Sequence, residues 1–214
     1  MKGNDTDGGQ RRRGLLLATL LAGLAGMVDA IGFIRLQHLF VSYMSGNSTQ
    51  FAVSVGRGRF DAAGQILVLI VLFVTGAAVG QLLAHVTGRR HLTAVLATVT
   101  MLLAVSALSD TAAGPLVMAM GALNAAMHRV GNINISLTFV TGSLVRFGQG
   151  LGDFVSARAN GWEWAEQAVP WLGIVGGGIL AGASYVCIGA AVDWMSVAAA
   201  TGLLLSSIAI PAPE

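Results

Sequence analysis

Apolar residues fill most of this chain in eight segments, separated by shorter connections that carry most of the charged residues. The first segment has about 21 residues, and as a helix it is roughly 30 Å long, the thickness of the hydrocarbon core of a bilayer. The pattern therefore predicts an all-α polytopic membrane protein. The eight segments cover residues 14–34, 38–56, 64–87, 91–109, 113–129, 134–152, 166–190 and 193–210.

Two of the eight segments, 38–56 and 134–152, are interrupted by polar side chains around a glycine. Polar atoms at bilayer depth are unfavourable unless they are paired or face water, and irregular backbone persists there only inside protein or along a cavity. We therefore expect two broken or re-entrant elements that form a binding site. The candidate binding residues are Ser45, Gly46, Asn47, Ser48, Thr49 and Gln50 in the first element, and Thr141, Gly142, Ser143, Arg146 and Gln149 in the second.

The glycines lower the cost of breaking a helix, and the neighbouring side chains of Ser45–Asn47 and Thr141–Ser143 are expected to cap the freed ends. The N-terminus of a half-helix presents unpaired N–H groups, which suit an anion or a carbonyl oxygen. In the alternative interpretation, the hydroxyl and amide groups only join helices through hydrogen bonds.

The two interrupted segments resemble each other, which indicates an internal duplication with repeats at residues 14–110 and 111–210. Repeats with an odd number of spans have inverted topology, an arrangement common in transporters. The matched positions include Gly46 and Gly142, Phe51 and Phe147, Gly56 and Gly152, and, upstream, Asp29 and Asn124.

Charge sets the expected topology. Only 10% of the residues are charged, whereas about 25% are charged in a soluble domain. With six spans, nine Lys and Arg residues fall in the cytoplasm and three outside; with eight spans the division is about seven to four. The positive-inside rule favours six spans, and both topologies place the two termini in the cytoplasm. Residues 1–13 are expected to form a disordered cytoplasmic tail, and residues 211–214 a short C-terminal tail.

Asp29 is a carboxylate within the first apolar segment. Its helical neighbours are small, so this face is expected to pack against protein rather than lipid. We expect Arg146 to be its partner. Two interpretations are open, namely an ion pair that only fixes helix register, or a coupling site for a proton or cation beside a substrate-binding arginine. The stripe of neighbours comprises Ala18, Ala22, Ala25, Gly26 and Gly32.

Motifs for enzymatic chemistry are absent from the sequence, which has no nucleophile elbow, no His-Glu-x-x-His and no phosphate-binding loop. We therefore expect no enzyme and no cofactor. Cys187 is the single cysteine, so no internal disulfide is possible, and no Cys/His cluster has the spacing of a metal site. The expected partners are the lipid bilayer, a small-molecule or ion substrate and a second copy of the chain, but no nucleic acid.

The two blocks "GMVDAIGFIRLQHLFVSYMSGNSTQF" (26–51) and "GALNAAMHRVGNINISLTFVTGSLVRFGQGL" (121–151) resemble the YoaK-like family of bacterial inner-membrane proteins, a domain of unknown function. The resemblance covers residues 14–210 and implies about six spans and an inner-membrane location, without implying a substrate. The family pattern often has a basic residue after each polar turn. Here Arg146 follows the second turn, whereas Gln50 follows the first, so a symmetric anion site is not expected.

The leading interpretation is a small transporter or channel for a small polar or anionic solute. Arg146 and the half-helix N-termini would hold the solute beside Asn124, and Asp29 would bind the coupling proton or cation. The alternative is a non-transporting membrane scaffold or regulatory protein, whose polar clusters serve helix packing.

The six-span topology predicts opposite sides of the membrane for two arginine positions. In a Cys187→Ala background, Arg57→Cys should react with a membrane-impermeant thiol reagent added outside intact cells. Arg89→Cys should react only after the membrane is permeabilised. Labelling of Arg89→Cys from outside would rule out six spans and favour eight.

Overall fold

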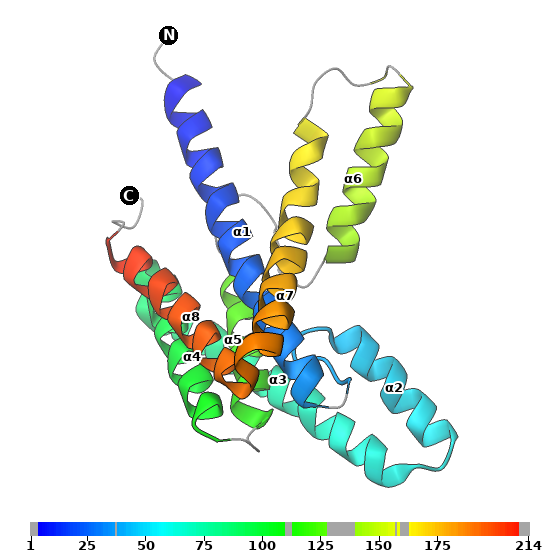
Figure 1. The fold of residues 1–214 in the computed structure, drawn as a ribbon. Helices are drawn as coiled ribbons and strands as arrows, with labels where there is room; N and C mark the ends of the chain where they lie inside the picture. The colour runs from blue at the N-terminus through cyan, green and yellow to red at the C-terminus, as the bar shows by residue number, and fades with distance from the viewer. Residues whose placement is uncertain are drawn as a thin grey trace.

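The computed structural model describes residues 4–36, 38–109, 113–127, 140–156, 158 and 163–209, and the regular structure in this part of the chain is helical. The long helices are α1 (Asn4–Arg35), α2 (Met44–Gly56), α3 (Phe60–Thr87), α4 (His91–Ala107), α5 (Ala113–Met127), α6 (Val140–Val155), α7 (Val169–Ile188) and α8 (Val192–Ala209) (Figure 1). Three 3-10 helices are η1 (Gly88–Arg90), η2 (Glu163–Ala168) and η3 (Gly189–Ala191). The predicted all-α polytopic membrane fold is confirmed.

Three helical stretches of the described residues are long and apolar enough to cross a membrane: Gly14–Arg35, Phe60–Ala107 and Trp164–Ala209. The second contains α3 and α4, and the third contains α7 and α8. A further apolar helix, Ala113–Ala125, is shorter. At 13 residues, α2 is about 20 Å long, too short to cross the hydrocarbon core unaided. Six spans with two additional elements remain the predicted topology.

The beginning of α1 differs from the expected disordered tail, because the helix starts at Asn4. Elongating an existing helix is much easier than starting one, so the apolar residues from Gly14 onward provide a stable helix that extends backward. The tail at 211–214 lies outside the described residues.

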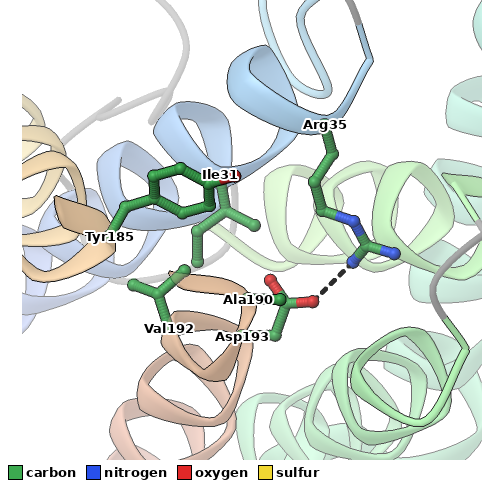
Figure 2. Close-up of a pocket in the computed structure, with 6 residues that line it drawn as sticks. All are labelled: Ile31, Arg35, Tyr185, Ala190, Val192 and Asp193. Atoms are coloured by element: carbon green, nitrogen blue, oxygen red, sulfur yellow. Dashed lines mark hydrogen bonds and ion pairs between the residues drawn. The ribbon is translucent and has the colours of Figure 1, made fainter. Parts of the chain in front are cut away.

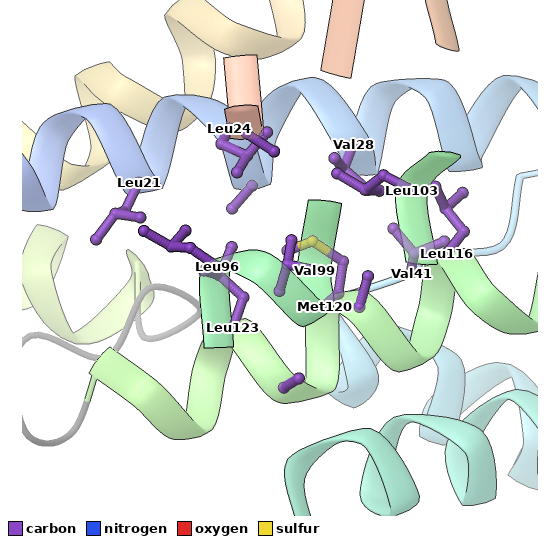
Figure 3. Packing of buried hydrophobic residues seen from close by; sticks show 14 of the residues in the cluster. Leu21, Leu24, Val28, Val41, Leu96, Val99, Leu103, Leu116, Met120 and Leu123 are labelled. Atoms are coloured by element: carbon purple, nitrogen blue, oxygen red, sulfur yellow. The ribbon is translucent and has the colours of Figure 1, made fainter. Parts of the chain in front are cut away.

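The apolar core is formed where α1, α4 and α5 meet, as Figure 3 shows. Val41, which follows α1 outside any helix, is also fully buried in this core. The chain after α1 is therefore held against the centre of the molecule. Other buried members of the cluster are Leu21, Leu24 and Val28 of α1, Leu96, Val99 and Leu103 of α4, and Leu116, Met120 and Leu123 of α5.

Small residues allow α1 and α7 to pack backbone against backbone. Gly177 lies against the backbone of Gly23, and Gly26 lies against the backbone of Ile174. A side chain at either glycine would overlap those backbone atoms. This close approach is typical of helix pairs in membranes, and it confirms the packing face predicted from the small residues around Gly26.

The helices of the first half of the chain (α1–α4) and those of the second half (α5–α8) pack in a reciprocal pattern. α1 packs on α7 while α5 packs on α3, and α4 contacts α5 while α8 contacts α1. The glycines match as well, because Gly121 of α5 lies against the backbone of Phe73 in α3. Both α3 and α7 are followed by a glycine with positive φ, 54° at Gly88 and 55° at Gly189, and each glycine begins a short 3-10 helix.

The α1–α7 contact predicts different effects for two adjacent glycines. Gly177→Ala would push a methyl group into the backbone of Gly23, and overpacking of this kind costs about 1–3 kcal/mol. We expect its thermal unfolding in nonionic detergent to occur at a lower temperature than that of the wild type.

The matched control is Gly176→Ala, because a Cβ there has no atom within 4 Å. The gain in helix propensity is up to about 1 kcal/mol, so this variant should unfold at the wild-type temperature or above it. Equal destabilisation of both variants would contradict the close approach.

Candidate functional site

The first break lies before the polar motif rather than inside it. The chain leaves the helical conformation after α1, passes through the α1–α2 connection (residues 38–43) and becomes helical again at Met44. The motif 45–50 forms the first turns of α2, where Ser48 donates to the carbonyl of Met44 (2.8 Å) and Thr49 to that of Ser45 (3.1 Å). The expected side-chain cap at the start of α2 is wrong, because the N-cap residue Tyr43 makes no capping side-chain hydrogen bond. The cap expected from Thr141–Ser143 stays a prediction.

Asp29 holds the α1–α2 connection in place. Its Oδ1 accepts hydrogen bonds from the backbone N–H groups of Val41 (3.1 Å) and Ser42 (2.8 Å), and its Oδ2 accepts one from the Ser42 hydroxyl. Asp29 lies six residues before Arg35, about 9 Å along the helix axis. Its carboxylate thus supplies acceptors to non-helical backbone within an apolar span, where water is scarce.

Asn47 of α2 also forms hydrogen bonds with the backbone of the α1–α2 connection. Its Oδ1 accepts a hydrogen bond from the N–H of Phe40 (3.1 Å), and its Nδ2 donates to the carbonyl of Phe40 (2.7 Å). Asn47 is fully buried. A carboxylate from α1 and an amide from α2 therefore hold three consecutive residues of the connection, which explains part of the polar character of the motif.

Gly46 has a steric role. A Cβ at this position would lie 2.7 Å from the Tyr43 ring and 3.3 Å from the Phe40 ring. The missing side chain therefore leaves space for two aromatic rings against the first turn of α2. Sequence reasoning had assigned Gly46 the different role of permitting a helix break.

The expected Asp29–Arg146 pair is wrong. Arg146 is exposed, and it donates from Nε to Oε1 of Gln167 (3.0 Å) and from Nη2 to the hydroxyl of Ser143 (3.4 Å). The physical reason is that Asp29 obtains neutral donors from nearby Val41 and Ser42, while Arg146 extends toward η2 instead.

The remaining predicted residues lie in several environments. Ser45, Ser48, Thr49, Thr141 and Gln149 are exposed, Gln50 and Gly142 are half-buried, and Ser143 is buried. Asn124 is buried in α5 and donates to the carbonyl of Met120 (2.8 Å). Thr141 and Gly142 belong to the first turn of α6, whereas residues 134–139 of the second interrupted segment lie outside the described residues.

A cavity of about 620 Å³ opens between α1, the α1–α2 connection, α6 and α7. Of the predicted site residues, it brings together Asp29 and Thr141, with Ser42 beside Asp29. The other predicted residues do not line it. Four aromatic side chains and the aliphatic side chains of α1, α6 and α7 complete the lining. The aromatic residues are Phe33, Phe40, Tyr43 and Trp171.

The sequence analysis did not predict an ion pair at the start of α8. Nη1 of Arg35 lies 2.7 Å from Oδ2 of Asp193, beside a second cavity of about 250 Å³ (Figure 2). Arg35 also donates to the hydroxyl of Ser106 (3.3 Å) and to the carbonyl of Ser109 (2.9 Å). The available signal was a pair of opposite charges at the edges of two apolar segments, 14–34 and 193–210.

Comparison with known proteins identifies similar membrane proteins. The family model described as "Protein of unknown function (DUF1275)" matches residues 17–207. The UPF0700 transmembrane protein RA0705 of Rhizobium meliloti (strain 1021) is 38% identical over 209 residues, which cover 94% of this chain and 91% of that protein. No solved structure matches the chain.

The bonds of Asn47 predict a stability effect that separates two positions of one motif. Asn47→Ala removes both partners of the Phe40 backbone, and each buried polar group left unsatisfied costs about 1–3 kcal/mol. We expect a clear fall in the thermal unfolding temperature of the purified protein. Thr49→Ala, which removes only an exposed bond within α2, should change stability by less than about 0.5 kcal/mol. Similar losses for both variants would show that the amide does not hold the connection.

Proposed function

The chain belongs to the DUF1275 family of transmembrane proteins, and from this premise we propose that it is a small transporter or channel for a polar solute. The observation that carries the proposal is the cavity of about 620 Å³, which is lined by α1 of the first half and by α6 and α7 of the second half. A site shared by two halves that move relative to each other is the arrangement used by many secondary transporters.

The reciprocal packing of the helices supports two inverted repeats. α1 packs on α7 as α5 packs on α3, and both contacts are made by glycines against backbone. In the proposed mechanism, one half rocks against the other and exposes the cavity to the two sides of the membrane in turn.

Asp29 is the proposed coupling residue. A carboxylate offers about four acceptor positions, and three are used by Val41 and Ser42. One position on Oδ2 is left for a proton or a cation at the cavity wall. Thr141 of α6, which also lines the cavity, is the proposed hydrogen-bonding group for the solute.

The cavity lining favours some solutes over others. Asp29 is the charged residue among its lining residues, and Arg146 is not among them. A site of this composition attracts neutral or positively charged groups, so a polar rather than an anionic solute is proposed. The proposed setting is the bacterial inner membrane, with both termini in the cytoplasm and a second copy of the chain as partner.

A specific observation favours the alternative of a non-transporting scaffold. The hydrogen bonds that Asp29 makes within the described part of the chain, and most of those of Asn47, run to residues 40–42. Such bonds are what a purely structural role requires. The two functions differ in whether solvent reaches the cavity from both sides of the membrane.

Thiol accessibility tests the proposal without a known substrate. In a Cys187→Ala background, Thr141→Cys places a thiol at the cavity wall. We expect it to react with a membrane-impermeant maleimide in both right-side-out and inside-out vesicles, because each orientation of the halves opens the cavity to one side.

The matched control is Gln149→Cys, which is exposed on the same helix but does not line the cavity. It should react from one side only. Reaction of Thr141→Cys from a single side, or from neither, would contradict alternating access and favour the scaffold.

A further inference from the structure

The cavity combines one carboxylate with four aromatic rings. Phe33 comes from α1, Phe40 and Tyr43 from the α1–α2 connection, and Trp171 from α7. Aromatic rings have negative faces that attract cations. The combination therefore provides negative potential from both the carboxylate and the ring faces.

Three of these rings form one continuous wall. The ring centres of Phe33 and Phe40 are 5.2 Å apart, and those of Phe40 and Tyr43 are 5.3 Å apart in an edge-to-face arrangement. Gly46 provides the space in which the last two rings lie. Tyr43 and Trp171 are 44% and 36% exposed, so both rings have surface available to a ligand.

The charge of Asp29 is not matched by a cation in the part of the chain that the structure describes. Its donors there are two backbone N–H groups and the Ser42 hydroxyl, all of which are neutral. These groups therefore give the Asp29 carboxylate hydrogen bonds but no positive charge. A cationic ligand would supply that charge.

We propose that this cavity binds an organic ammonium ion, with the ammonium group beside Asp29 and between the rings of Phe40, Tyr43 and Trp171. The inference rests on the proposed function and names the class of its solute. A volume of about 620 Å³ lies within the range of roughly 300–1,000 Å³ that is usual for small-molecule sites. The aliphatic side chains of α6 and α7 would contact the apolar groups of the ligand.

The experiment compares ligands of equal shape and different charge. The full-length protein in nonionic detergent is titrated with choline and with 3,3-dimethyl-1-butanol, in which carbon replaces the ammonium nitrogen, and binding is followed by calorimetry. Choline should bind and the neutral alcohol should bind much more weakly. Equal binding of the two, or binding of neither choline nor dodecylphosphocholine, would overturn the proposal.

Two variants locate the site, each with a matched control. Trp171→Leu should weaken choline binding roughly 2- to 30-fold, whereas Trp194→Leu, an exposed tryptophan of α8, should leave it unchanged. Asp29→Asn should abolish the preference for choline over the alcohol, whereas Asp153→Asn, an exposed position of α6, should not. The Trp171 side chain makes no hydrogen bond with other residues that the structure describes, so Trp171→Leu keeps the test decisive if Asp29→Asn fails to fold. Unchanged binding in Trp171→Leu would place the ligand elsewhere and overturn the proposal.

The ammonium group can belong to a soluble cation or to a lipid headgroup, and a further pair of measurements separates them. Binding of free choline supports a soluble ligand, whereas stabilisation by dodecylphosphocholine alone assigns the site to a headgroup. Uptake of choline into vesicles made without choline lipids then tests the proposed function separately. Binding without uptake would contradict transport but support the ammonium site. Uptake of neutral solutes without choline binding would support transport but contradict the ammonium site.

Discussion

Backbone polar groups at bilayer depth have to be satisfied by the protein, because no water is available there to take their place. The connection between α1 and α2 leaves the helix inside an apolar region, so its N–H and C=O groups need partners from side chains. Asp29 and Asn47 provide them. The position of the cavity depends on this arrangement, since the bonded residues of the connection carry Phe40, Ser42 and Tyr43 into its lining.

The cavity also depends on the close approach of α1 and α7. Lipid tails are as apolar as leucine, so helices in a membrane associate through close packing rather than through burial from water. Gly23, Gly26 and Gly177 allow backbone contact, which fixes α7 beside the connection. Trp171 of α7 thereby lines the same cavity as Phe33 and Phe40, which come from elements far from α7 in the sequence.

The sequence was sufficient for the helices and insufficient for the contacts of the charged groups. Apolar length predicted a helix at 91–109, close to the observed His91–Ala107, and small-residue spacing predicted the α1 packing face. Arg146 was predicted as the partner of Asp29 because both are among the few charged residues of the apolar segments. The actual donors to Asp29 are mainly backbone N–H groups, which every residue except proline has, so the sequence does not single them out. The Arg35–Asp193 pair depends on the register between α1 and α8, which only the packed structure determines.

Arg35 of α1 connects to two further helices, since it contacts Asp193 at the start of α8, Ser106 near the end of α4 and Ser109 just after α4. The ends of α1, α4 and α8 are therefore tied at a single point that includes both halves of the chain. A rotation of one half against the other displaces atoms least near such a point and most at a distance from it. In a rocking motion of the kind proposed above, the ion pair would act as a pivot, and the largest displacements would occur toward the opposite ends of α1 and α7.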